Sequence, residues 1–153
     1  MIVLGIDPGQ TGGFAQVSEG QLLDAWPMPL EKALTKKPTL DFWCAANAGW
    51  KDPDYVVIES VHAMPAQGVS SSFQFGRMFG AVEMLAQFYD CEIVYVTPQK
   101  WKKHFNLLKT DKSASVAKAT GLYGAEHWKL KKHEGVAEAA LIATWGLHQL
   151  TKE

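Results

Sequence analysis

Four acidic residues have the types and positions needed to hold divalent metal ions. Asp7 ends an apolar run that opens the chain, Glu59 ends a second apolar run, and Glu134 and Glu138 lie four residues apart near the C-terminus. Helical side chains at that spacing stand about 5 to 6 Å from each other, so their like charges would repel unless a cation bound to both. Carboxylate oxygens favour hard ions such as Mg²⁺ or Mn²⁺, and two such ions roughly 4 Å apart commonly cleave a phosphodiester.

A second interpretation of Glu134 and Glu138 needs no metal. Both follow Lys131, Lys132 and His133, and acidic residues at a solvated helix start are favoured by the helix dipole. Both interpretations of this pair stay open at this point.

Asp7 and Glu59 are harder to explain without a cation. A charge in a buried strand is costly unless it has a cation or a hydrogen-bonded partner. The two carboxylates become neighbours if the first and fourth strands pair, and this favours a metal site over a solvated surface.

The elements that would position these residues form an α/β pattern. Three short runs with Glu19-Gly20 as a hairpin turn predict an antiparallel meander, and two later runs predict further strands. The expected strands are 2–7, 13–18, 22–26, 54–60 and 92–96. A polar loop is expected at 60–72, and helices at 39–48, 72–89, 98–106, 111–122 and 134–149. We therefore expect one mixed five-stranded sheet flanked by helices.

Length and composition favour a single domain over residues 1–153. The chain is 47% apolar and has six tryptophans, enough for one well-packed core. The two cysteines, Cys44 and Cys91, are too far apart for a zinc motif and too few for a disulfide framework, so we expect a reducing compartment. No apolar stretch approaches the 18 to 20 residues of a membrane span, so we expect a soluble, cytoplasmic protein without a membrane partner.

Charge is distributed unevenly. The formal net charge is −1, but the segment from Lys100 to Lys132 holds nine lysines against Asp111 and Glu126, a net +7. Such a segment is typical either of solvated helix faces or of a surface that binds phosphates.

The combined motifs resemble the RuvC group of the RNase H-like nucleases, in particular the compact Holliday junction resolvases of phages. The resemblance rests on the order and separation of three segments that span most of the chain. They are Gly5-Ile6-Asp7-Pro8-Gly9 with Thr11-Gly12-Gly13, then Val57-Ile58-Glu59, then Glu134 to Ala143. The resemblance implies an RNase H-like fold and an Mg²⁺-dependent endonuclease that uses two ions, with Mn²⁺ as a possible substitute.

By that resemblance, Asp7 is the metal-bridging carboxylate, Glu59 binds one ion and Glu138 matches the acid of the final helix. In cellular members the companion of that acid lies three residues earlier, where this chain has Gly135. Glu134, four residues earlier, points to the same face and is the expected fourth ligand, with His133 as an alternative.

The resemblance also implies DNA contacts. Lys102 and Lys112 are expected beside the scissile phosphate, where a fixed cation offsets developing charge. Sequence-independent affinity is expected from Lys100, Lys103 and Lys109. An aromatic residue after the second carboxylate stacks at the junction in cellular resolvases. The candidates for that role here are His62 and Phe73, whereas Phe75 is expected to belong to the core.

A four-way junction is roughly two-fold symmetric, so the resemblance implies a homodimer, with the helix at 72–89 and its Met78, Phe79 and Met84 as the expected interface. Other functions stay open: a nuclease for flaps, other branched DNA or RNA, and a non-catalytic junction-binding protein. An actin-like ATPase shares an aspartate beside a Gly-rich turn but needs a second such domain, so no nucleotide cofactor is expected.

Overall fold

The computed structural model describes residues 1–30, 51–62 and 65–152, so the helix predicted at 39–48 lies outside the described residues. The five expected strands are present and form one sheet in the order β3-β2-β1-β4-β5. Their bounds are β1 Ile2–Asp7, β2 Gly13–Ser18, β3 Gln21–Pro27, β4 Tyr55–Glu59 and β5 Glu92–Val96. The predicted mixed sheet is confirmed, because β1, β2 and β3 pair antiparallel whereas β4 pairs parallel with β1 and β5.

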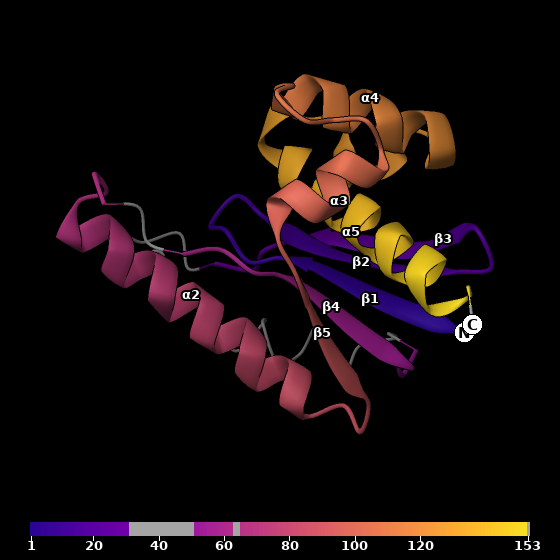
Figure 1. Ribbon diagram of the computed structural model, residues 1–153, viewed down its shortest axis with the longest axis horizontal. Helices are drawn as coiled ribbons and strands as arrows, with labels where there is room; N and C mark the ends of the chain where they lie inside the picture. The colour runs from indigo at the N-terminus through magenta and orange to yellow at the C-terminus, as the bar shows by residue number, and fades with distance from the viewer. Residues whose placement is uncertain (31–50, 63–64, 153) are drawn as a thin grey trace.

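The central strands are buried on both faces, and their alternating side chains separate two cores. Leu4, Ile6 and Ile58 pack against α2 (Val69–Gln87) on one face. Val3 and Val57 pack on the other face against α5 (Glu134–Leu150). Figure 1 shows α2 along one side of the sheet, with α3, α4 and α5 on the other. This period of two decides which side chains face α5.

Helix α5 lies unusually close to the sheet. A Cβ on Gly5 of β1 would come within 2.3 Å of the Ala139 carbonyl oxygen, and one on Gly146 within 2.5 Å of the Val57 side chain. Small residues on both sides therefore let the helix backbone approach the strand backbone, and this contact fixes where the acidic residues of α5 lie.

The helix bounds differ from the predicted ones at the ends. Helix α2 begins at Val69, so the polar loop predicted at 60–72 is shorter, because Ser70, Ser71 and Ser72 continue into the helix. Helix α3 spans Pro98–His104 and ends before 106, where Asn106 takes a positive φ of 58°. Helix α4 spans Lys112–Tyr123. None of the described helices has the length and apolarity that a membrane crossing requires.

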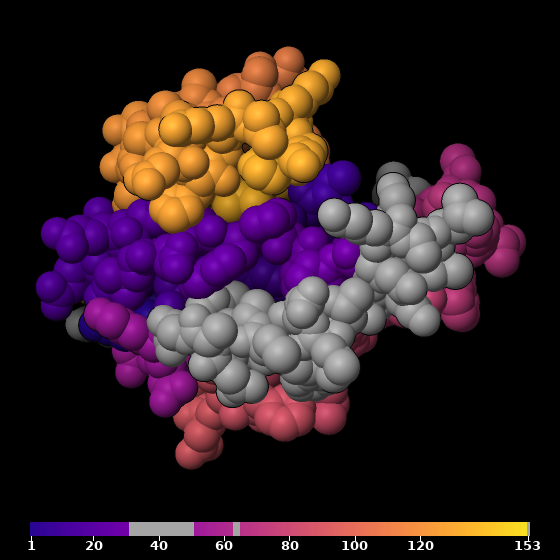
Figure 2. Space-filling model, turned by 180° about the vertical axis from the view of Figure 1, so that it is seen from behind, coloured from indigo at the N-terminus to yellow at the C-terminus, as the bar shows by residue number. Residues whose placement is uncertain are grey.

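Two short 3-10 helices connect α4 to α5, at Glu126–Trp128 and Lys131–His133. Figure 2, seen from behind, shows the orange part of the chain, which includes α4 and these turns, covering one side of the indigo and purple strands. The lysine-rich segment from Lys100 to Lys132 is thus gathered in the helical layer that also contains α5.

The predicted dimer surface on α2 needs one correction. Met78 is fully buried and belongs to the same core cluster as Leu4 and Ile58, so it cannot contribute to an exposed face. Phe79 is partly buried in the same core. Met84, the third residue named, is 53% exposed, and Phe73 on the same helix is 69% exposed.

Candidate metal and nuclease site

Strand register brings the first two carboxylates together. Ile6 pairs with Ile58 across the parallel β1 and β4 strands, so the next residues, Asp7 and Glu59, end neighbouring strands at the same edge of the sheet. Because side chains alternate, Asp7 shares a face with Gly5 and Glu59 with Val57, and that face packs on α5.

Close packing of two glycines places the third carboxylate. A Cβ on Gly135 would lie 2.1 Å from the Thr11 carbonyl oxygen and 2.6 Å from Gly12 Cα, so the first turn of α5 touches the β1-β2 turn. Glu138 follows one turn later and reaches the two strand carboxylates. The Gly135 that departs from the family spacing thus has a packing role.

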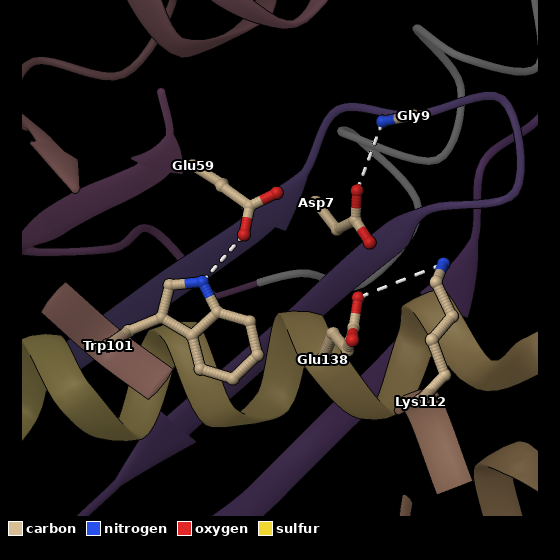
Figure 3. A network of polar contacts seen from close by, with 6 residues as sticks. All are labelled: Asp7, Gly9, Glu59, Trp101, Lys112 and Glu138. Atoms are coloured by element: carbon tan, nitrogen blue, oxygen red, sulfur yellow. Dashed lines mark hydrogen bonds and ion pairs between the residues drawn. The ribbon is translucent and has the colours of Figure 1, made fainter. Parts of the chain in front are cut away.

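Each carboxylate has a distinct partner, as Figure 3 shows. The Gly9 amide donates to Asp7 Oδ1 at 3.1 Å, and the Trp101 indole donates to Glu59 Oε2 at 2.6 Å. Lys112 Nζ lies 3.9 Å from Glu138 Oε2, whereas Glu138 Oε1 is buried with no hydrogen-bond partner. The site therefore contains a fully buried carboxylate oxygen, Glu138 Oε1, that lacks a donor.

The three carboxylates disfavour ionisation of one another. Burial, followed by the charge of Glu59, raises the pKa of Asp7 from 3.8 to about 6. Burial also raises the pKa of Glu59, although the Trp101 hydrogen bond opposes this. The pKa of Glu138 is raised by burial and then by the charge of Asp7. Three desolvated, mutually repelling oxygen ligands are a setting that a divalent cation would stabilise.

The donor set fits a hard divalent ion such as Mg²⁺. All the available donors are carboxylate oxygens, and the unpartnered Glu138 Oε1 is a free ligand atom. Within the described residues, no three acidic, histidine or cysteine side chains already stand in a metal-binding arrangement. Glu59 and Glu138 make their contacts with Trp101 and Lys112 instead.

Glu134, the expected fourth ligand, lies at the start of α5. It is the first residue of α5, is half-buried, and stands one helical turn before Glu138. The charges that shift the pKa values of the three clustered carboxylates are those of the carboxylates themselves, Lys102 and Lys112. His133, the alternative fourth ligand, caps the same helix end without a side-chain hydrogen bond.

Two of the predicted lysines face the carboxylates. Lys112 opens α4 and makes the ion pair with Glu138. Lys102 of α3 lies over the Trp101 ring, 5.4 Å from its centroid, and its charge lowers the pKa of both Glu59 and Glu138. The site thus has two cations beside its three acids.

The other predicted DNA contacts lie outside the cluster. Lys100 and Lys103 are exposed on a different side of α3, and Lys109, with a φ of 61°, is exposed in the turn after it. His62 is exposed and lines a cavity of about 530 Å³ that Ser60 and Phe75 also line. Phe75 is partly buried at this cavity and belongs to neither core cluster of the described residues, so its predicted place in the core is wrong, whereas Phe73 is exposed.

Sequence reasoning missed Trp101 as a part of the site. Its side chain is fully buried, and its single donor is bonded to Glu59, 42 positions earlier. A tryptophan among lysines carries no local sign of a buried acceptor. Only the tertiary contact identifies it.

The fold is the RuvC-like form of the RNase H fold. The Thermus thermophilus RuvC in complex with a Holliday junction substrate matches with a TM-score of 0.70 at 21% identity, over 99% of this chain and 97% of that chain. A second Thermus thermophilus RuvC structure matches at 0.67 with 20% identity, over 99% and 98%. A yeast mitochondrial Holliday junction resolvase matches at 0.50 with 14% identity, over 98% and 80%.

The sequence itself gives no further match. No family model and no curated protein matches it. At 14% to 21% identity the solved structures carry the fold alone, so the activity has to be argued from the residues of this chain.

Proposed function

We propose that this chain is a metal-dependent endonuclease that cuts branched DNA, with the four-way Holliday junction as its substrate. The observation that carries the proposal is the buried group of Asp7, Glu59 and Glu138, assembled from two strand ends and a distant helix. Burying three acids together lowers the stability of the fold. A reaction that depends on a bound cation explains why the three acids are nevertheless placed together.

In this proposal Asp7, Glu59 and Glu138 hold Mg²⁺, with Mn²⁺ as a substitute and Glu134 as a further ligand from the preceding turn. Two such ions would polarise the scissile phosphodiester and activate water for in-line attack. The protein residues keep the ligands in place: Gly9 donates to Asp7, and Trp101 donates to Glu59.

Lys112 and Lys102 supply fixed positive charge next to the acids. In the proposed reaction they contact the phosphate and stabilise the charge that develops on it. The Lys112 side chain is 51% exposed, so it can leave Glu138 for a substrate phosphate.

Branched DNA is the proposed substrate because the matching Thermus thermophilus RuvC was solved with a Holliday junction. A two-fold symmetric junction would be served by a homodimer. The outward side of α2, with Phe73 and Met84 exposed, is the proposed interface, and light scattering of the purified protein tests it.

The decisive experiment compares substrates in Mg²⁺: a mobile four-way junction, a Y-fork, a flap and an RNA–DNA hybrid of matched sequence. We expect the junction to be cut fastest. Asp7→Asn should abolish cutting and keep junction binding, whereas Asp90→Asn, the same change at an exposed turn, should cut normally.

Other outcomes identify the rival functions. Faster cutting of the flap or the hybrid would assign a different substrate to the same site. Junction binding without any cutting by the unmodified protein would indicate a non-catalytic binding protein. Unchanged cutting by Asp7→Asn would show that the carboxylate group is not the nuclease site.

A further inference from the structure

A groove on the helical layer lies outside the carboxylate group. It has a volume of about 380 Å³ between α3 and the end of α5. Its lining residues are Lys100, Lys103 and His104 from α3, and Trp145, Gln149 and Lys152 from α5 and the residues after it. We call it the α3-α5 groove. Three of these side chains are lysines, and no acid is among the described residues that line it.

Helix α3 presents its basic residues on two sides. Lys100, Lys103 and His104 are three and four positions apart and share one side, which faces the groove. Lys102 and Trp101 point elsewhere, to the carboxylates. The basic residues of α3 therefore face two different sites, the α3-α5 groove and the carboxylates.

A hydrogen bond holds the two walls of the groove together. His104 Nε2 and His148 Nδ1 are 2.9 Å apart and link α3 to the last turns of α5. The pKa of His104 is lowered by burial and then by the charges of His148, Lys152 and Lys118. The charge of Lys152 thus acts on the His104 imidazole, in agreement with the place of both residues in the lining of the same groove.

Three lysines and no acid stand among the described residues that line the groove, and this charge favours an anionic ligand. Repulsion among Lys100, Lys103 and Lys152 is relieved when phosphates bind, and a phosphodiester chain supplies phosphates at regular spacing. The half-buried Trp145 and Gln149 add an apolar surface and an amide to the groove, a combination typical of surfaces that follow a nucleic acid strand.

We propose that the α3-α5 groove binds the phosphate backbone of one strand of the DNA substrate beyond the cleavage point. This inference rests on the proposed function, because it assumes that DNA reaches the carboxylates. The groove and the carboxylates lie on different sides of α3, and a helix with its side chains is only about 10 to 12 Å across. One DNA strand can therefore contact both.

The test is the salt dependence of junction binding. In an Asp7→Asn background, which prevents cutting, Lys103→Gln and Lys152→Gln are compared with Lys51→Gln. Lys51 is exposed just before β4, its backbone is hydrogen-bonded to the Gln16 side chain, it does not line the groove, and its loss changes net charge equally. The dissociation constant for a four-way junction is measured from 50 to 300 mM salt.

Each groove variant should flatten the slope of log affinity against log salt by about 0.9, and should weaken binding about five- to tenfold at 0.1 M salt. Lys51→Gln should leave slope and affinity unchanged. The groove proposal is overturned if the groove variants keep the full slope, or if Lys51→Gln lowers it as much as they do.

Failure of the proposed function would look different. In that case the protein with Asp7 intact would cut no four-way junction in Mg²⁺, whatever the slopes of the lysine variants. If the unmodified protein cuts the junction but the lysine variants keep the full salt slope, the groove proposal is wrong and the proposed nuclease function stands.

Discussion

The indole nitrogen of Trp101 donates a 2.6 Å hydrogen bond to Oε2 of Glu59 inside the protein. The bond is buried and joins α3 to the end of β4. It lowers the pKa of Glu59 against the effect of burial and leaves the second oxygen of that carboxylate available. Trp101 is therefore a positioning residue for the metal site that we propose.

Replacing Trp101 by Phe tests this role, because the ring stays and the donor is lost. We expect cutting to fall about 10- to 100-fold, the usual range for the loss of an outer partner of a metal ligand. The Mg²⁺ concentration needed for half-maximal rate should rise. The measurement is the cutting rate across a Mg²⁺ titration.

Trp128→Phe is the matched control. Trp128 donates to Thr120 Oγ1 at 3.0 Å, away from the carboxylates. It should lose about 0.5 to 1.5 kcal/mol of stability and show the same Mg²⁺ requirement as the unmodified protein. Equal Mg²⁺ requirements in the two variants would show that Trp101 is not a positioning residue for the metal site.

Asp7 should make the metal-free protein less stable as pH rises. Its pKa is about 6 in the folded state against 3.8 ordinarily, so the folded protein binds this proton more tightly than the unfolded chain does. Stability should therefore fall between pH 4 and pH 6 and level off above, by up to roughly 3 kcal/mol. Urea unfolding in EDTA at several pH values measures it.

Asp7→Asn should remove most of that fall and make the metal-free protein more stable than the unmodified one at pH 7. Added Mg²⁺ should stabilise the unmodified protein and have little effect on Asp7→Asn. If Asp7→Asn is less stable than the unmodified protein at pH 7 in EDTA, the claim that the buried carboxylates destabilise the metal-free protein is wrong.

The sequence predicts the strands of the sheet well, because the apolar pattern of a strand depends only on residues that are neighbours in the chain. Apolar runs that end in Asp7 and Glu59 locate both strand ends, and the parallel pairing then follows from the expected topology. The helix ends are less predictable. Asn106 leaves the helical conformation with a φ of 58° in the connection between α3 and α4, and Ser70 to Ser72 lengthen α2 although serine also favours loops.

The site could be predicted only in part, because some of its contacts depend on the packing of segments that are distant in the sequence. Asp7, Glu59 and Glu138 stand at recognisable places in their elements, and the structure brings them together. Helical spacing predicts Glu134 as a ligand, but spacing fixes a face and not the depth of burial, and Glu134 lies one turn before Glu138. The partner of Trp101 depends on a contact between distant segments that no local pattern encodes.

Gly135→Ala should distort the metal site through packing. The added methyl would meet the Thr11 carbonyl, so α5 or the β1-β2 turn must move. We expect a loss of about 1 to 3 kcal/mol in stability and reduced cutting. Chemical denaturation and the junction assay measure the two effects.

Gly121→Ala is its control, because a Cβ there meets nothing within 4 Å and Gly121 lies inside α4. This change should raise stability by about 0.5 to 1 kcal/mol and leave cutting unchanged. The packing role of Gly135 would be wrong if both glycine variants gained stability.

Glu138→Gln and Glu134→Gln separate the two acids of α5. Glu138 is 5% exposed and lies beside Asp7, whereas Glu134 is half-buried at the helix start. We expect Glu138→Gln to lose at least about 100-fold in cutting rate, beyond the range for an outer partner of a ligand. Glu134→Gln should lose less. Equal losses would give Glu134 the same standing as a ligand.

The three clustered carboxylates come from the first strand, the fourth strand and the last helix of the fold. During synthesis, the strands that bear Asp7 and Glu59 are complete long before the helix that bears Glu138 leaves the ribosome. A growing chain therefore has no means of assembling this cluster, and contacts so distant in sequence form late in folding. The proposed nuclease activity would therefore be absent until the final helix docks.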